Sequence, residues 1–157
     1  MAETKKAVEK TVKKPRLAKT RGKQPEGKWF LMDAKGKILG RLAVQVARLL
    51  TGKDKKTFLP HWESGDSVVV INAKEITVSG TKRTKKMYKH YTGYQGGLKE
   101  YNFEKLMEKD PTAIIKKAVK GMLPKNRLGS RMLNRLFVYS DDKHKQQAQK
   151  PEILETK

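Results

Sequence analysis

Hydrophobic residues follow two different periods along the first half of the chain, and these predict a strand, a helix and a second strand. The apolar run at 28–33 is typical of a buried strand, and Gly36 marks the turn after it. From 39 to 50 the apolar residues recur at helical spacing, and Gly52 suits the C-terminal cap of that helix. The uninterrupted run SVVVIN at 67–72 indicates a strand covered on both faces.

Helical patterns dominate the second half. One helix is predicted around residues 102–109, and another begins at Asp110 or Pro111, where a capping residue precedes a proline that the first helical position tolerates. The apolar stripe of this second helix consists of Ile114, Ile115, Ala118, Val119 and Met122. Pro124 ends it, and a short helix carrying basic residues as far as Arg135 follows.

Shorter segments complete the predicted fold. Residues 76–78 and 137–139 are expected to be extended, and the tail from Asp141 is polar. Residues 81–97 are basic, aromatic and rich in glycine, which favours an exposed loop or an irregular hairpin. The alternation of strands and helices predicts an α/β fold in which a parallel sheet lies between helices.

The first 28 residues have a different composition from the rest. Basic residues far outnumber acidic ones, and there is no aromatic residue to help build a core. Such a segment buries too little apolar surface to offset its ordering entropy. We therefore predict a disordered basic arm at 1–28, followed by a single domain at 29–157 that ends in a polar tail. The arm is interpreted either as a solubilising tail or as a segment that orders against a polyanion.

The amino-acid composition indicates which kinds of molecule the protein binds. Lys and Arg number 37 against 16 Asp and Glu, which gives a formal net charge of +21 and favours a nucleic-acid partner. Since no apolar run approaches the roughly 18 residues of a membrane-spanning helix, we predict no membrane partner. The chain has no cysteine, which excludes disulfides, thiolate zinc sites and thiol nucleophiles. The start of the sequence lacks the apolar stretch of a secretory signal, so we expect a cytoplasmic protein.

Two basic segments indicate RNA. At 82–94, lysines and an arginine alternate with tyrosines and a histidine, a pairing that suits phosphates and splayed bases, although the rings also have a local packing interpretation. The stretch 116–139 is rich in Lys and Arg and has no acidic residue. Arg127, Arg131 and Arg135 recur there at helical spacing beside a leucine and methionine stripe. We predict that phosphates supplied by another molecule neutralise these guanidinium groups.

Signals for catalysis are weaker. His61, Glu63 and Asp66 lie within six positions and offer an alternative, a metal-dependent nuclease site, but Asp66 also reads as a turn residue. The glycine patterns of phosphate-binding and dinucleotide-binding loops are missing, and residues 35–41 read equally as a turn or as a backbone phosphate contact. We predict no catalytic site, no metal site, no cofactor and no small-molecule substrate.

Several short motifs, in order and at matching spacing, are shared with one known family. They are 39–43 (LGRLA), 60–61 (PH), 65–66 (GD), 70–73 (VINA), 77–82 (TVSGTK), 91–94 (YTGY) with 96–97 (GG), 118–125 (AVKGMLPK), and His144, Ala148, Gln149 and Pro151. On these motifs the chain resembles the bacterial-type large-subunit ribosomal proteins of the L-thirteen family from about Trp29 to Leu154. The basic arm is longer than that family leads us to expect.

The resemblance implies a three-layer α/β/α fold with a small, mostly parallel sheet. It also implies a non-enzymatic constituent of the large ribosomal subunit that binds large-subunit ribosomal RNA, contacts neighbouring ribosomal proteins and supports subunit assembly. A free regulatory RNA-binding protein remains the alternative. The residues predicted to contact RNA are Arg41, Lys53, Lys55, Lys56, Lys82, Arg83, Lys85, Lys86, Tyr88, Lys89, His90, Tyr91, Tyr94, Lys120, Lys125, Arg127, Arg131 and Arg135.

Overall fold

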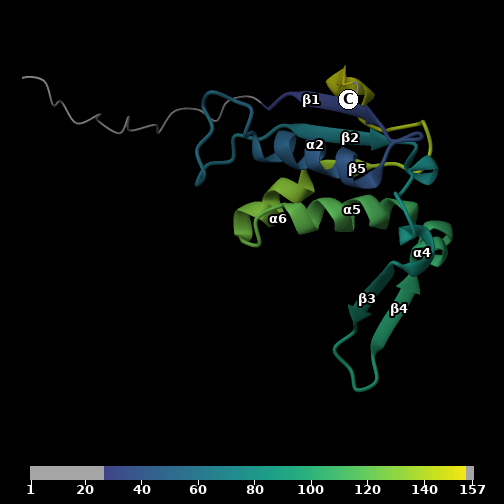
Figure 1. The fold of residues 1–157 in the computed structure, drawn as a ribbon. Helices are drawn as coiled ribbons and strands as arrows, with labels where there is room; N and C mark the ends of the chain where they lie inside the picture. The colour runs from purple at the N-terminus through teal and green to yellow at the C-terminus, as the bar shows by residue number, and fades with distance from the viewer. Residues whose placement is uncertain (1–26, 155–157) are drawn as a thin grey trace, which may run out of the picture.

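A four-stranded parallel sheet forms the centre of the molecule (Figure 1). The computed structural model describes residues 27–154, and the predicted arm at 1–28 lies outside them except for its last two residues. The strands run in the order β5-β2-β1-β6, with bounds Leu136–Val138, Ser67–Ile71, Trp29–Asp33 and Glu152–Ile153. Every neighbouring pair is parallel. The prediction of an α/β fold on a small parallel sheet is confirmed.

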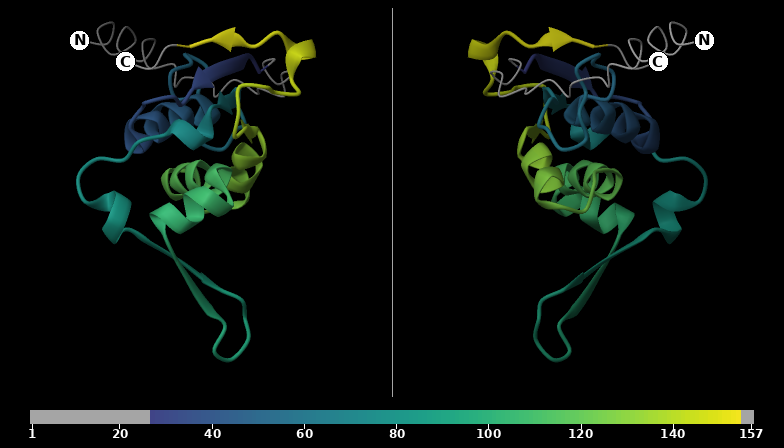
Figure 2. Two further views of the ribbon diagram at one scale, coloured as in Figure 1. Left: turned by 90° about the vertical axis from the view of Figure 1, so that its right-hand side faces the viewer. Right: turned by 90° about the vertical axis from the view of Figure 1, so that its left-hand side faces the viewer.

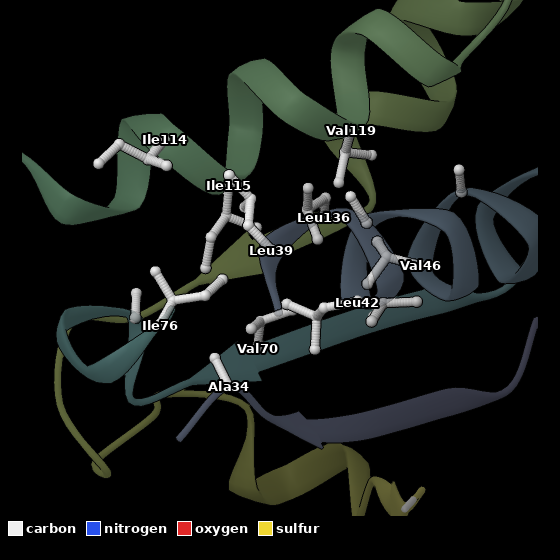
Figure 3. Packing of buried hydrophobic residues seen from close by; sticks show 14 of the residues in the cluster. Ala34, Leu39, Leu42, Val46, Val70, Ile76, Ile114, Ile115, Val119 and Leu136 are labelled. Carbon is white, nitrogen blue, oxygen red and sulfur yellow. The ribbon is translucent and has the colours of Figure 1, made fainter. Parts of the chain in front are cut away.

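Two long helices lie on one side of this sheet. Helix α2 (Leu39–Thr51) connects β1 to β2 and ends at Gly52, whose φ of 71° is the left-handed conformation that a glycine adopts without a steric penalty. Helix α5 (Pro111–Met122) packs against α2 and also contacts β5, with its apolar side chains pointing towards the sheet (Figure 3). Both elements agree with the predicted spans to within about a turn.

The main core fills the space between these helices and one face of the sheet. Alternate residues of β2 point in opposite directions, so Val68 and Val70 join this core while Val69 faces the other way. The labelled core residues in Figure 3 are Ala34, Leu39, Leu42, Val46, Val70, Ile76, Ile114, Ile115, Val119 and Leu136. Met122, which was predicted to belong to the apolar stripe of α5, is instead 44% exposed because it lies in the last turn, beyond the packed part of the helix.

The C-terminal segment covers the other face of the sheet. The short 3-10 helix η2 (Gln147–Gln149) lies on this side, opposite α2 and α5 (Figure 1). The rings of Trp29 and Phe137 stack there with centroids 5.4 Å apart. The chain then enters β6, which pairs with β1. The sequence predicted only a polar tail here, because a strand of two residues carries no readable period.

A β-hairpin projects from the body of the molecule (Figures 1 and 2). After a short helix α3 (Lys82–Lys85), strands β3 (Met87–Tyr91) and β4 (Leu98–Asn102) pair antiparallel over their full lengths. The segment is therefore a regular hairpin, closer to the second of the two predicted alternatives. The predicted extended piece at 76–78 follows η1 (Ala73–Glu75): Ile76 has an extended backbone, and Thr77 forms one isolated parallel bridge with Ile38.

Two further helices complete the fold: α4 (Phe103–Lys109) connects the hairpin to α5, and α6 (Arg127–Asn134) connects α5 to strand β5 of the sheet. Helix α4 begins at Asn102, which accepts the backbone N–H of Phe103, and leads directly into α5. Helix α6 follows α5 and leads into β5. Both were predicted, the first around residues 102–109 and the second as a short helix that carries Arg127 to Arg135. Among the described residues, no helix combines the length and apolar character that crossing a membrane requires.

The N-terminal cap of α5 gives a stability prediction. The Asp110 carboxylate accepts the Thr112 hydroxyl at 2.7 Å and the backbone N–H groups of Thr112 and Ala113 at 3.0 and 3.2 Å. These hydrogen bonds, the Thr112 hydroxyl first, lower the pKa of Asp110 against an opposing effect of burial. Because the folded pKa is lowered, the stabilisation is present above the ordinary Asp pKa of about 3.9 and disappears as the pH falls through the folded value.

We expect Asp110→Ala to reduce the free energy of unfolding by about 1 kcal/mol at pH 7 and by less at pH 3, as measured by urea unfolding. Asp110→Asn is the control, since asparagine caps a helix about as well as aspartate without a titrating group. An equal cost of Asp110→Ala at both pH values would contradict a role for the carboxylate charge.

Candidate nucleic-acid interface

Two adjoining grooves run along α5. The α5–α6 groove has a volume of about 760 Å³ and lies between α5, the turn after it and α6. The α2–α5 groove, of about 690 Å³, lies between the start of α2, α3 and α5. Lys117 and Gly121 of α5 line both grooves, so the two lie side by side along this helix.

Cationic side chains line both grooves. We define the basic strip as the Lys and Arg residues that line the two grooves: Arg41, Lys82, Lys86, Lys117, Lys120, Lys125 and Arg127. Within the part of the chain that the structure describes, neither groove is lined by a carboxylate and no member of the strip forms an ion pair. Such a surface repels itself unless an anion lies along it.

Local structure brings the cations of the α5–α6 groove together. Lys117 and Lys120 are three residues apart on α5 and so lie on the same face of the helix. After α5, Asn126 caps α6 by accepting the backbone N–H of Gly129 at 2.8 Å. A Cβ on Gly129 would lie 1.8 Å from the Pro124 carbonyl oxygen, so only a glycine allows α6 to pack this closely against the turn.

The predicted arginine stripe is divided by the structure. Arg127 lines the α5–α6 groove, but Arg131 pairs with Glu63 at 3.1 Å. Arg135 is only 24% exposed in its side chain and donates to the Gly65 carbonyl at 2.7 Å and to Glu63 at 3.3 Å. The hypothesis that phosphates neutralise all three arginines therefore needs correction: Glu63 supplies an intramolecular counter-charge for two of them.

The loop between α2 and β2 is held by acidic residues. Asp66 is buried, accepts the backbone N–H of Lys28 at 2.8 Å and pairs with Lys55, whose side chain is 25% exposed. Lys53 and Lys56 are exposed. Since Glu63 and Asp66 both bind cations of the fold, neither is free as a metal ligand, and the described residues contain no group of three His, Asp or Glu side chains placed to hold a metal ion.

The hairpin presents its tip residues to solvent. Tyr91 is 59% exposed and Tyr94 is 79% exposed, and His90 and Lys85 are also exposed. Two other predicted RNA contacts have carboxylate partners: Lys89 pairs with Glu100 at 2.7 Å, and Arg83 pairs with Glu104 at 3.1 Å. These pairs are largely exposed, and exchanging such a partner for a phosphate costs little.

Tyr88 differs from the tyrosines at the tip. The ammonium groups of Lys86 and Lys117 lie 5.3 and 5.4 Å from the centre of its ring. Burial raises the pKa of the Tyr88 hydroxyl, which has no hydrogen-bond partner among the described residues. The local packing interpretation therefore describes Tyr88: its ring fixes the base of the hairpin against α5 and holds two cations of the basic strip in place.

Residues 35–41 consist of a hydrogen-bonded turn and the first residues of α2. The backbone N–H groups of Gly36 and Leu39 donate to the carbonyls of Glu75 and Thr77, so they are not free for phosphate. Lys35 N–H donates to the Asp33 carboxylate; burial alone would raise the pKa of Asp33, but this bond, the Asn72 amide and the nearby lysines lower it. The part of this segment that faces the α2–α5 groove with a positive charge is the Arg41 side chain.

Comparison with known proteins identifies the family. The sequence profile of the family described as Ribosomal protein L13 matches residues 27–145, which is most of the chain. This chain belongs to the ribosomal protein L13 family. The family predicted from the short motifs is therefore confirmed.

The curated relatives include proteins with the name large ribosomal subunit protein uL13. The protein of Thermoanaerobacter sp. (strain X514) is 58% identical over 128 residues, covering 82% of this chain and 90% of the relative. That of Clostridioides difficile (strain 630) is 52% identical, covering 83% and 91%. That of Legionella pneumophila (strain Corby) is 49% identical, covering 86% and 94%. The similarity to these L13 proteins therefore extends over nearly their whole length.

Sequence reasoning missed one residue of the candidate interface. Lys117 lies where the two grooves meet and over the ring of Tyr88, yet it was not among the predicted contacts. The sequence contained a signal for Lys117: it lies three residues before Lys120, and both are on the face of the helix opposite the apolar stripe. Its position between two grooves depends on α2 and α3, which are distant in sequence.

Proposed function

We propose that this protein is a structural constituent of the large ribosomal subunit that binds large-subunit ribosomal RNA. Membership of the ribosomal protein L13 family gives the class of particle. The basic strip supports the RNA-binding part of the proposal, because its cations line adjoining grooves with no carboxylate among the described lining residues. Phosphates of a folded RNA are closely spaced and supply the missing negative charge.

Three surfaces contribute to RNA binding in this proposal. The basic strip holds the phosphate backbone, with Arg and Lys side chains as the donors. The hairpin tip adds Tyr91, Tyr94 and His90, whose exposed rings stack on unpaired bases. Lys53 and Lys56, exposed in the loop after α2, contact the backbone at the edge of the footprint. Arg131 and Arg135 mainly stabilise the fold through Glu63.

The proposed role is non-enzymatic. The carboxylates of the alternative nuclease site are paired with cations of the fold, as described above for Glu63 and Asp66. The protein instead supports assembly of the subunit by holding RNA segments and touching neighbouring ribosomal proteins. The same arrangement favours a ribosomal constituent over a free regulatory protein, because the basic strip and the hairpin together form a long, uneven surface suited to a large folded RNA.

Sedimentation tests this function. A tagged full-length chain, expressed in cells at its normal level, is expected to sediment with the large subunits in a sucrose gradient and to remain there when the particles are washed with moderate salt. A protein recovered only at the top of the gradient, even at low salt, would contradict the proposal. Small-subunit proteins in the same fractions report whether the association is specific for the large subunit.

A further inference from the structure

The α5–α6 groove has an apolar floor beneath its cations. The α2–α5 groove also has apolar lining residues, among them Ile38, Leu39 and Val78. Leu123, Pro124 and Leu133 line the α5–α6 groove, and Leu123 is almost fully buried. Gly121, where a Cβ would meet no other atom within 4 Å, adds no side chain to the groove. The rim consists of Lys117, Lys120, Lys125 and Arg127. The groove thus combines an apolar floor with a cationic rim, whereas phosphate binding alone requires only the rim.

This combination matches the chemistry of a single unpaired nucleotide. The base has flat apolar faces that gain from leaving water, while the phosphates on either side of it seek cations. A paired helix keeps its bases stacked inside and offers only sugars and phosphates at its surface, so an apolar floor adds nothing to binding a duplex. A volume of about 760 Å³ lies within the range of roughly 300–1,000 Å³ that holds small organic ligands.

We propose that the α5–α6 groove receives an unpaired nucleobase of the bound RNA. The base lies on Leu123, Pro124 and Leu133, and the phosphates that flank it contact the lysines and the arginine of the rim. This inference rests on the proposed RNA-binding function. It adds that the groove selects a nucleotide of a bulge or loop over a base-paired nucleotide.

The presence of cations in both grooves favours RNA over an acidic protein segment as the occupant. At Lys117 and Gly121 the groove adjoins the α2–α5 groove, where Arg41, Lys82 and Lys86 add further cations. The phosphates of a nucleotide chain lie at regular intervals on both sides of an inserted base and so reach the cations of both grooves. An acidic amphipathic peptide would use the rim and floor of one groove but would leave the cations of the other groove unmatched.

Gly121 provides a way to fill the groove without changing its charge. A Cβ at this position would meet no other atom within 4 Å, so a larger side chain projects into open space. Gly121→Leu therefore blocks the groove while leaving every cation in place, and leucine is a better helix former than glycine. Gly40→Leu is the matched control, because Gly40 is equally open but lines only the α2–α5 groove.

The test compares two RNA probes by fluorescence anisotropy at 0.1 M salt: a fully paired duplex, and the same duplex with one bulged adenosine. We expect the full-length protein to bind the bulged RNA about tenfold more tightly, because the inserted base removes apolar surface of the floor from water. Gly121→Leu should reduce this ratio to about one, and Gly40→Leu should preserve it. Thermal unfolding followed by circular dichroism confirms that both variants are folded.

The outcomes separate this inference from the proposed function. Equal binding of both RNAs by the wild-type protein, or a preference retained in Gly121→Leu, would overturn the base-binding groove and leave RNA binding intact. Failure to bind either RNA would overturn both. A polyglutamate peptide serves as a third probe: if Gly121→Leu abolishes binding of the peptide and leaves the preference for the bulge unchanged, the groove is a protein site and the inference is wrong.

Discussion

Replacing the four cations of the α5–α6 groove by glutamine is expected to weaken binding to large-subunit ribosomal RNA about a thousandfold at 0.1 M salt. The residues to replace are Lys117, Lys120, Lys125 and Arg127. Each phosphate that a cation neutralises releases counterions and contributes about 0.7–0.9 log units of affinity per tenfold dilution of salt below 1 M. Leaving four phosphates without their cations removes about three log units of affinity, and it lowers the slope of log affinity against log salt by about three.

A matched variant distinguishes the groove from net charge. Lys28, Lys35, Arg48 and Lys74 each pair with an exposed carboxylate, and replacing them by glutamine lowers the formal net charge of +21 by the same four. Filter binding to an rRNA transcript, at salt concentrations from about 0.05 to about 0.5 M, measures both slopes. If the two variants lose the same affinity, the effect comes from overall charge, and the groove is not the site.

Gly65→Ala is expected to reduce the free energy of unfolding by about 3 kcal/mol or more, or to prevent folding. A Cβ on Gly65 would lie 1.7 Å from the carbonyl oxygen of Leu50. That oxygen belongs to the backbone near the end of α2, so it cannot move aside as a flexible side chain would. Either α2 or the start of β2 must shift, and both elements form the main core.

The same substitution at Gly121 is the control for Gly65→Ala. Gly121 lies in α5 with open space where its Cβ would be, so alanine there should leave stability unchanged or raise it by up to about 1 kcal/mol. Urea unfolding of the two variants at pH 7 gives the comparison. Similar midpoints for Gly65→Ala and the wild-type protein would show that the loop before β2 relaxes without loss of packing.

The central part of the fold was predictable because its signals are local. The apolar spacing from Leu39 to Leu50 places a helix, and Gly52 ends it with the expected left-handed conformation. Asp110 and Pro111 similarly fix the start of α5 to within one residue. Because parallel strands require a connection that crosses the sheet, a strand, a helix and a continuous apolar strand in that order largely determine how β1, α2 and β2 pack.

The remaining parts of the fold depend on interactions between distant residues. Strand β6 has only two residues and forms because the edge of β1 is available for pairing. The hairpin was predicted as a loop or an irregular hairpin, since its charged and aromatic residues mask the alternation that marks a strand. At the candidate site, the partner of Arg131 and Arg135 is Glu63, about seventy positions away, and no local pattern reveals such a pair.

Composition indicated a nucleic-acid partner and a basic region of the chain, but it did not distinguish the surroundings of the individual residues in the predicted contact set. The excess of cations without nearby carboxylates pointed to the region of α5 and α6, where Lys120, Lys125 and Arg127 line a groove with no carboxylate among its described lining residues. It did not separate Tyr88, which packs at the base of the hairpin, from Tyr94 at the tip. Those roles depend on depth in the folded molecule, which an alternating sequence of lysines and tyrosines does not encode.

The projecting hairpin makes one region of this small protein independent of the rest. Its strands pair only with each other, and it is attached at its base, where Phe103 N–H donates to the Lys86 carbonyl and Tyr88 packs against α5. An isolated two-stranded ribbon gains little stability from its own pairing. Substitutions at its tip therefore leave the folding of the globular body nearly untouched, so that stretch is free to evolve according to its binding partner alone.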